Sequence, residues 1–474
     1  MSEEVTDLVI IGGGSAGIVA AKGAGNVNAS VIMIEPNAPG GDCLWTGCVP
    51  SKRILSAAHA AYVMRTADIH GMTAVEPEID FTAVMSKITD SQNHIAHHDS
   101  VETIESYGAK VIAERGEFIG EGQIKAGDQV IRYRKAMIAT GATPFVPPIP
   151  GLREAAPLTS DSIWELKELP KRMVVIGAGA IGCELGQAFA RLGSEVTLIE
   201  AAPRILPMVG PQVGEVVAKQ MRSEGMTVIE GEKVTSVEGS TADGNAVVIV
   251  EDELRIETDA ILVAVGRKAN TENLGLETVG VELDERGHVA VNDMLQSSNS
   301  HIYAGGDVVG KMPFTHTAGH HGAAVVMNAL FKIPRKFNHD QIPFAIFCDP
   351  EVASVGKIEG NDIETHHFEY DQLDRAVTSG HPVGFIDLFT EKGKLVGATV
   401  VGVSAGETIN ELTARVTAGA KLRTVASMVR PYPTYGEAIT KAANITLSED
   451  LFNDRNKALT GKVLNFLGKY DTPK

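Results

Sequence analysis

The chain contains the same glycine-rich strand–turn–helix–strand pattern twice. In the first copy, an apolar strand-like run is followed by Gly12, Gly14 and Gly17, and a second such run ends on Glu35. The pattern restarts at residue 173, with the same spacing from its first glycine to its terminal acid. The second copy contains Gly177, Gly179, Ala180, Ile181, Gly182 and Glu200. This repeat of a mononucleotide-binding unit predicts an α/β fold with two Rossmann-like domains, each binding one dinucleotide.

The residue types in these motifs suit the binding of a pyrophosphate and a ribose. Gly12 permits a tight turn, and Gly14 lets backbone N–H groups approach a pyrophosphate at a helix N-terminus. Gly17 allows the helix to pack closely on the strand. The carboxylates of Glu35 and Glu200 are placed to accept hydrogen bonds from ribose hydroxyls. A single glycine motif is weak evidence for a ligand, but its repetition makes chance a poor explanation.

Two of the four cysteines lie just after the first motif. Cys43 and Cys48 fall within the segment 40–52, which reads GGDCLWTGCVPSK. In a regular helix, side chains five residues apart point to different faces, so a disulfide here requires unwound backbone. Gly47 supplies that conformational freedom. We interpret the pair as a redox-active disulfide; the alternative is two free, buried cysteines.

Charge and cysteine usage exclude several classes of protein. The formal net charge of −18 argues against nucleic acid or an anionic membrane as a partner. The acidic start of the chain does not resemble a secretory signal, and no apolar run is long enough to span a membrane. Four cysteines in 474 residues do not make a disulfide framework, which indicates a reducing compartment. The sequence therefore predicts a cytoplasmic protein.

The position of the cysteine pair indicates which dinucleotide each motif binds. A cofactor extended from the first motif would place its reactive end near the sulfurs, and a flavin can pass an electron pair to a disulfide. We therefore predict FAD at the first motif and a nicotinamide donor at the second. Glu200 favours NAD(H) over NADP(H), because a carboxylate repels a 2′-phosphate, although Arg204 could moderate this repulsion.

The segment 40–52 resembles the redox motif of the class I pyridine nucleotide-disulfide oxidoreductases. This family includes dihydrolipoamide dehydrogenase, glutathione reductase and mercuric reductase. Residues 137–142, 264–267 and 302–307 resemble further segments of the family, and the resemblance covers essentially the whole chain. It implies an FAD-binding domain at 1–148 and 269–340, an NAD(P)-binding domain at 149–268, and a C-terminal α+β dimerisation domain at 341–474. That last domain would form a homodimer and lend residues to the partner's active site.

The resemblance also implies roles for individual residues. Cys43 would be the interchange thiol that meets the substrate, and Cys48 the thiol beside the flavin. Lys52 would lie near flavin N5 and pair with Glu184, where its charge favours a thiolate and a reduced flavin. The residues expected to contact FAD are Gly12, Gly14, Ser15, Gly17, Glu35, Gly41, Lys52, Thr140, Gly141, Asp307 and Thr315. Those expected to contact NAD are Gly177, Gly179, Ala180, Ile181, Gly182, Glu200 and Gly266.

The C-terminal part departs from the commonest family pattern. Members that handle dithiols usually carry a His-Pro-Thr segment followed by a Glu, which act together as acid and base. This chain keeps Glu437 but has Tyr432 at the His position. A Tyr titrates near 10, against about 6.5 for His, and is a poor proton shuttle at neutral pH. Mercuric reductase resembles this chain in having Tyr there, yet normally ends with a vicinal Cys pair, whereas no Cys follows Cys348 here.

Two groups of histidines could suggest a metal site. His94, His97 and His98 fall in a helix-like stretch, 81–107, at a spacing that would place them on one face. We interpret them as a solvated polar face. His316, His320 and His321 follow Asp307, where we expect packing near the flavin. We predict no metal at either group.

The sequence thus predicts a flavin-dependent NAD(P)H:disulfide or soft-metal oxidoreductase. Electrons would pass from NADH through FAD to the pair Cys43 and Cys48, and then to a small-molecule acceptor. Three alternatives stay open: a diaphorase, quinone reductase or transhydrogenase-like flavoenzyme, a dihydrolipoamide dehydrogenase, and a non-catalytic flavoprotein scaffold.

Overall fold

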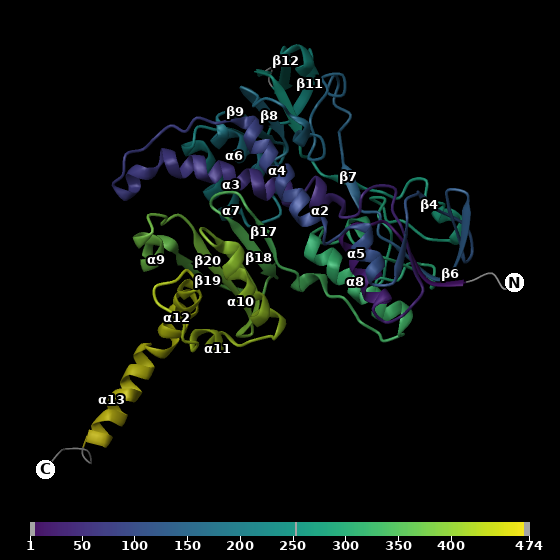
Figure 1. Ribbon diagram of the computed structural model, residues 1–474. Coiled ribbons are helices and arrows are strands. Elements are labelled where there is room, and N and C mark those ends of the chain that lie inside the picture. The colour runs from purple at the N-terminus through teal and green to yellow at the C-terminus, as the bar shows by residue number, and fades with distance from the viewer. Residues whose placement is uncertain (1–4, 252–253, 469–474) are drawn as a thin grey trace. The chain divides into compact units, whose positions relative to one another are not determined.

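The computed structural model describes residues 5–251 and 254–468 of the chain (Figure 1). It divides into two compact units between His339 and Asp340. Among the described residues, no helix combines the length and the apolar character needed to cross a bilayer.

The first unit contains a seven-stranded sheet built on β1 (Val5–Ile11). Its order is β3-β2-β1-β6-β5-β4, and β16 also pairs with β6. β2 and β6 both run parallel to β1, and the apolar run 8–11 is buried at its centre. The other strands are β2 (Val31–Ile34), β3 (Ala109–Ile112), β4 (Gly116–Gly120), β5 (Gln123–Ala126), β6 (Gln129–Ile138) and β16 (Ile302–Ala304).

Helices place the functional segments around this sheet. α1 (Ser15–Gly25) packs closely on α8 (Thr315–Leu330), since a Cβ on Gly322 would lie 2.4 Å from the carbonyl oxygen of Ala16. The cysteine segment forms α2 (Gly41–Trp45) and the start of α3 (Cys48–Arg65). The remaining helices between β2 and β3 are α4 (Phe81–Ala96) and α5 (Val101–Ser106).

A second, four-stranded parallel sheet has the order β10-β9-β8-β14. Its strands are β8 (Arg172–Ile176), β9 (Glu195–Glu200), β10 (Thr227–Glu230) and β14 (Ala260–Val263), accompanied by α6 (Ala180–Leu192) and α7 (Pro211–Ser223). A three-stranded antiparallel sheet lies between β10 and β14 in the sequence: β11 (Val234–Glu238), β12 (Ala246–Val250) and β13 (Arg255–Thr258).

Two short strands, β7 (Ala142–Pro144) and β15 (Arg267–Ala269), pair with each other where the chain passes between the seven-stranded sheet and the four-stranded sheet. The division expected from the sequence, at 148/149 and 268/269, leaves one of these sheets in each part.

The second unit is an antiparallel sheet of order β17-β18-β21-β20-β19 with helices. The strands are β17 (Phe344–Ile346), β18 (Val352–Gly356), β19 (Ile363–Glu369), β20 (Phe385–Glu391) and β21 (Lys394–Val401). The helices are α9 (Asp374–Thr378), α10 (Ala405–Thr417), α11 (Leu422–Ala426), α12 (Glu437–Leu451) and α13 (Asp454–Gly468). Residues of the sheet, α10 and the start of α12 share one buried core. The α/β fold class and the C-terminal α+β unit are therefore confirmed.

One expected helix is shorter than the sequence indicated. Instead of one helix over 81–107, α4 ends at Ala96 and α5 begins at Val101. Ser100 caps α5, because its hydroxyl accepts a hydrogen bond from the Thr103 N–H at 3.2 Å. His97 is therefore the C-cap residue of α4 and His98 follows it, so the three histidines do not lie within one helix. Their rings still lie close together, with centroids 6.3 Å apart for His94 and His97 and 3.8 Å apart for His97 and His98.

Candidate active site

The two cysteines of the redox motif lie on either side of a helix break. α2 ends at Trp45 and α3 begins at Cys48. The N–H groups of Thr46 and Gly47 both donate to the carbonyl oxygen of Asp42, at 3.0 and 2.5 Å. The backbone is therefore unwound at Gly47, as the sequence predicted. The break brings the Cys43 and Cys48 thiols within hydrogen-bonding distance of each other, and both are free thiols in this structure.

The two sulfurs have opposite acid–base character. The hydrogen bond from the Cys43 thiol, followed by the Thr315 hydroxyl and the Lys52 charge, outweighs burial and lowers the pKa of Cys48 to about 6. Its Sγ lies 3.2 Å from Thr315 Oγ1, at the first residue of α8, where the helix dipole also favours a negative charge. The hydrogen bond to Cys48, together with burial, raises the pKa of Cys43. Near neutral pH, Cys48 therefore holds the negative charge and Cys43 keeps its proton.

The Thr315 hydroxyl gives a testable contribution to this asymmetry. Thr315→Val removes a hydrogen bond to a charged sulfur, so the pKa of Cys48 should rise by about 1–2 units. The reduced enzyme would then form its first thiolate at higher pH, measured by anaerobic titration of ultraviolet thiolate absorbance. Thr317→Val is the matched control, because Thr317 Oγ1 is buried in α8 without a hydrogen-bond partner among the described residues. Equal curves for wild type and Thr315→Val would refute this role for Thr315.

An ion pair between a partly exposed lysine and a buried glutamate lies one turn further along α3. Lys52 Nζ is 2.8 Å from Glu184 Oε2, and the Glu184 side chain on α6 is only 8% exposed. A buried carboxylate needs such a partner, and the pair fixes where the ammonium group lies. The structure thus brings together Lys52 and Glu184, as the resemblance implied.

The first glycine motif forms a close-packed turn at the start of α1. Gly12 has a φ of +113°, which favours glycine, and a Cβ on Gly17 would lie 1.9 Å from the Gly12 carbonyl oxygen. α1 begins at Ser15, and its N-cap residue, Gly14, provides no side-chain cap. A Cβ on Gly41 would lie 2.8 Å from Gly14 Cα, so the cysteine segment packs directly against this turn.

The second motif repeats the first down to its hydrogen bonds. Glu35 Oε2 accepts from the Gly13 N–H at 2.6 Å, and Glu35 Oε1 accepts from the Asn37 N–H at 2.9 Å. Glu200 accepts in the same way from the Ala178 and Ala202 N–H groups, at 2.7 and 2.8 Å.

The second glycine turn is also as crowded as the first. A Cβ on Gly182 would lie 1.9 Å from the Gly177 carbonyl oxygen, and Gly179 at the N-cap of α6 provides no side-chain cap. Helix N-termini that have a glycine as the N-cap residue and no side-chain cap fit the pyrophosphates of two dinucleotides.

Several residues expected to contact a cofactor lie near Arg267, a residue for which the sequence predicted no role. Its guanidinium hydrogen-bonds the Asp42 carboxylate, between the first motif and Cys43. Thr140, the residue before Gly141, donates a hydrogen bond from its Oγ1 to the Asn270 carbonyl oxygen at 2.7 Å. Gly266, with a φ of +136°, precedes Arg267. Burial raises the pKa of Asp307, whose carboxylate is also influenced by the charges of Arg267 and Asp42.

In the second unit, Tyr432 has a partner that its sequence neighbourhood did not indicate. Its hydroxyl donates to Asp374 Oδ2 at 2.7 Å, and this hydrogen bond raises the pKa of Tyr432. The Tyr432 side chain is exposed, while Glu437 lies at the start of α12, with Lys441 Nζ 3.5 Å from its Oε1.

The histidines after Asp307 differ in their surroundings. His316 and His320 are exposed on α8, whereas His321 is fully buried. The Gly306 N–H donates to His321 Nδ1 at 3.1 Å, and His321 Nε2 lies 3.0 Å from His339 Nε2. Burial lowers the pKa of His321 to about 3, so it packs as a neutral side chain beside the Asp307 segment. Within residues 5–251 and 254–468, no group of three His, Cys, Asp or Glu side chains is arranged to hold a metal ion.

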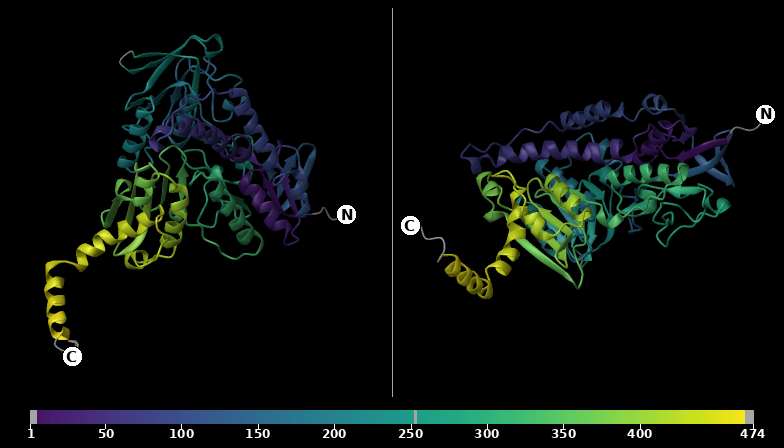
Figure 2. Two further views of the ribbon diagram at one scale, coloured as in Figure 1. Left: turned by 60° about the vertical axis from the view of Figure 1, so that its left-hand side comes forward. Right: turned by 90° about the horizontal axis from the view of Figure 1, so that it is seen from below.

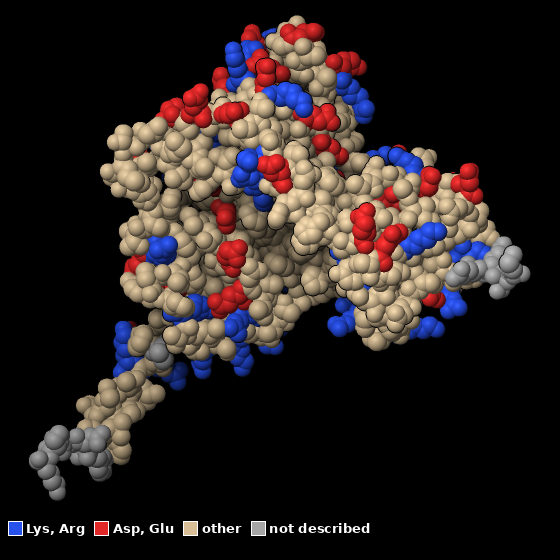
Figure 3. All heavy atoms as spheres, viewed as in Figure 1, with Lys and Arg blue, Asp and Glu red and all other residues tan. Residues whose placement is uncertain are grey.

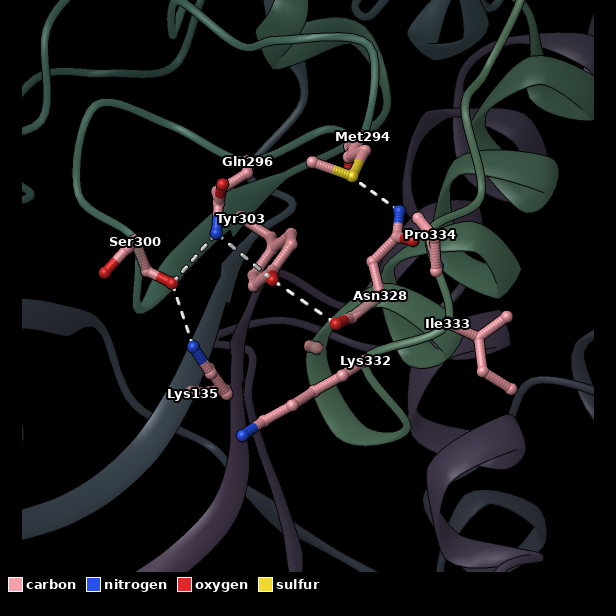
Figure 4. Close-up of a pocket in the computed structure, with 10 residues that line it drawn as sticks. Lys135, Met294, Gln296, Ser300, Tyr303, Asn328, Lys332, Ile333 and Pro334 are labelled. Atoms are coloured by element: carbon pink, nitrogen blue, oxygen red, sulfur yellow. Dashed lines mark hydrogen bonds between the residues drawn. The ribbon is translucent and has the colours of Figure 1, made fainter.

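A hollow of about 310 Å³ lies near the C-terminal end of α8 (Figure 4). Lys135 and Lys332 extend into it beside the ring of Tyr303. None of the residues expected to bind a cofactor lines this hollow.

A dithiol with one acidified sulfur, packed against the first of two similar glycine turns, is the arrangement expected of a flavoprotein disulfide reductase. The family model for pyridine nucleotide-disulphide oxidoreductases matches residues 6–322, and the model for the dimerisation domain of these enzymes matches residues 342–443. The chain therefore belongs to the pyridine nucleotide-disulphide oxidoreductase family, whose enzymes use FAD and NAD(P)H. The dimerisation domain supports a homodimer.

Similar proteins fall into more than one branch of this family. A mercuric reductase of Staphylococcus aureus is 35% identical over 454 residues, covering 94% of this chain and 83% of the relative. A dihydrolipoyl dehydrogenase of Bacillus subtilis is 32% identical over 467 residues, covering 94% and 97%.

Solved structures agree with this placement. LpdA of Mycobacterium tuberculosis superposes with a TM-score of 0.84 at 26% identity, covering 93% of this chain and 99% of that one. The Cu(II) complex of the HOCl-induced flavoprotein disulfide reductase RclA of Escherichia coli has a TM-score of 0.81 at 26% identity, covering 92% and 99%.

Proposed function

We propose that this enzyme oxidises NADH and delivers the electron pair, through Cys43 and Cys48, to a soft metal ion or a disulfide. The observation that carries the proposal is the acidified Cys48 beside a protonated Cys43, with Thr315 and Lys52 stabilising the charge. When bound, FAD supplies hydride acceptance from NADH and two-electron transfer to sulfur. Overall, NADH and a divalent soft-metal ion give NAD⁺, the reduced metal and one proton.

The chain's own residues hold charge and protons in this scheme. Cys48 carries the thiolate, and Lys52, anchored by Glu184, holds a positive charge beside it. Cys43 would be the sulfur that meets the acceptor; it is protonated at rest and releases its proton to solvent when it attacks a disulfide or binds the metal ion. The uncapped starts of α1 and α6 would bind the two pyrophosphates through backbone N–H groups.

Glu200 supports NADH as the donor. Its two oxygens already accept hydrogen bonds from the Ala178 and Ala202 N–H groups, which fix the position of the carboxylate at the end of β9. An ionised carboxylate can accept a bond from a ribose 2′-hydroxyl but repels a 2′-phosphate.

Tyr432 supports a soft metal ion over a dithiol as the acceptor. The hydrogen bond to Asp374 keeps the phenol protonated at neutral pH, so it does not relay protons to and from a leaving thiolate. In the family dimer this segment would serve the partner's active site. Two relatives named mercuric reductase share at least 33% identity with this chain.

An acceptor panel with Tyr432→His tests this specificity. We expect the wild-type enzyme to reduce Hg(II) with NADH faster than lipoamide or glutathione disulfide. Tyr432→His should raise the kcat/KM for lipoamide by at least about tenfold, because an imidazole supplies general acid–base catalysis. Tyr435→Phe is the matched control, because Tyr435 lies in the same segment as Tyr432 but its hydroxyl forms a hydrogen bond with Ser379. Lipoamide turnover by the wild type that exceeds Hg(II) turnover would instead favour a dihydrolipoamide dehydrogenase.

A further inference from the structure

Helix α13 presents an apolar face to solvent. Leu459, Val463 and Leu467 are 61%, 48% and 49% exposed, and their spacing of four residues places them on one side of the helix. Leu464 and Phe466 extend this face on its two sides and are also exposed. No side chain of α13 in the described part of the chain is buried, and the helix projects away from the core of the second unit (Figures 1 and 2). Exposed apolar faces of this kind mark interaction surfaces.

Cations border the apolar face of α13 on both sides. At about 100° per residue, Arg455 and Lys462 lie along one edge and Lys457 along the other. Asp454, at the helix start, is the single acidic residue among residues 454–468. Long basic side chains in these positions can extend away from the apolar face while their charged ends stay in water.

A second basic feature lies in the same unit. Lys392, Lys394, Lys421 and Arg423 are exposed around the β20–β21 turn and α11, which are joined by a bridge between Lys394 and Lys421. Figure 3 shows Lys and Arg gathered around α11, at the end of this unit from which the C-terminal helices extend. Residues 415–474 contain ten Lys and Arg against five Asp and Glu, although the whole chain carries a net charge of −18. The net charge of residues 415–474 is therefore positive, opposite in sign to that of the whole chain.

We propose that α13 lies in the surface of an anionic lipid bilayer, with its apolar face among the acyl chains and its cations at lipid phosphates. A helix with Leu and Phe on one face and Lys and Arg at its borders is the type that binds in this plane. The Lys392, Lys394, Lys421 and Arg423 cluster adds attraction to the same surface. The family model for the dimerisation domain matches residues 342–443, and α13 lies beyond this match. For this segment, the proposal departs from the expectation of no anionic partner, which was drawn from the net charge of the whole chain.

Vesicle flotation with the FAD-loaded full-length enzyme tests the proposal. We expect the wild type to float with phosphatidylcholine vesicles that contain about 30% phosphatidylglycerol, and not with phosphatidylcholine alone. The double variant Leu459→Ser with Leu467→Ser should lower the bound fraction at least about tenfold. Lys457→Gln with Lys462→Gln should weaken binding and reduce its dependence on salt. The matched control is Asn465→Ser, on the opposite side of α13, which should bind like the wild type.

All the substituted positions are exposed, so each variant should fold like the wild type. Flavin absorbance and thermal unfolding check this. The proposal is overturned if the wild type does not float with anionic vesicles, or if the Leu459→Ser, Leu467→Ser variant floats equally well. Loss of the dimer in this variant, without vesicle binding by the wild type, would assign the apolar face to a second copy of the chain.

Discussion

Replacing Cys43 by Ser should lower NADH-dependent reduction of a soft metal ion or disulfide by at least about 10³-fold. Cys43 is the sulfur expected to meet the acceptor, and it gives up its proton when it attacks a disulfide or binds a metal ion. A serine hydroxyl neither forms the disulfide nor binds a soft metal well. Reduction of artificial dyes by NADH should persist in this variant, because dyes accept electrons from the flavin directly. Steady-state kinetics with each acceptor, at matched FAD content, measures both effects.

The control for Cys43→Ser is a thiol outside the redox motif. Cys348→Ser changes a buried cysteine of the second unit and should leave acceptor reduction close to wild type. If Cys43→Ser keeps its turnover with the best natural acceptor, the enzyme is a diaphorase or quinone reductase in which the cysteines are secondary. A bound flavin that NADH cannot reduce in the wild type would point instead to a scaffold protein.

A matched pair of variants, one in each glycine motif, should have different effects on the binding of FAD and of NADH. Gly17→Ala and Gly182→Ala each place a methyl group 1.9 Å from a carbonyl oxygen, of Gly12 and Gly177 respectively. Both changes force the helix away from its glycine turn, at a cost of about 1–3 kcal/mol or more. We expect Gly17→Ala to be purified with little or no FAD. Gly182→Ala should retain FAD but show a KM for NADH raised at least about tenfold.

Because the two clashes are equal in size, a general loss of folding would affect both variants alike. Flavin absorbance of the purified proteins and stopped-flow reduction by NADH distinguish the two sites. FAD loss in Gly182→Ala, with FAD retained in Gly17→Ala, would reverse the assignment of the two motifs.

Much of this arrangement could be predicted because the relevant signals are local in sequence. A glycine turn and a terminal acid lie within one strand–helix–strand unit, and Glu35 and Glu200 make matching hydrogen bonds in the two copies. The unwound backbone at Gly47 follows from the five-residue spacing of the cysteines. The break after α4 was also readable, since Ser100 is a good helix N-cap, but the histidine spacing suggested one continuous helix.

The contacts that the sequence did not predict join residues far apart in the chain. Thr315 touches Cys48 across 267 positions, and Arg267 bonds Asp42 across 225. Asp374 accepts the Tyr432 hydrogen bond from a short helix with no motif of its own. These pairs depend on how the helices pack on the sheets, which no local pattern specifies. The basic character of α13 was not predicted for another reason: the net charge of −18 is a sum over the whole chain and does not show a local excess of Lys and Arg.

The central claim is that an electron pair from NADH reaches the sulfurs of Cys43 and Cys48, and anaerobic titration of the oxidised holoenzyme with NADH tests it most directly. The account predicts that the first equivalent of NADH produces the long-wavelength absorbance of a thiolate in contact with oxidised flavin, while most of the flavin colour remains. Cys48→Ser should not produce this band. Bleaching of the wild-type flavin by the first equivalent, with no such band, would contradict the account.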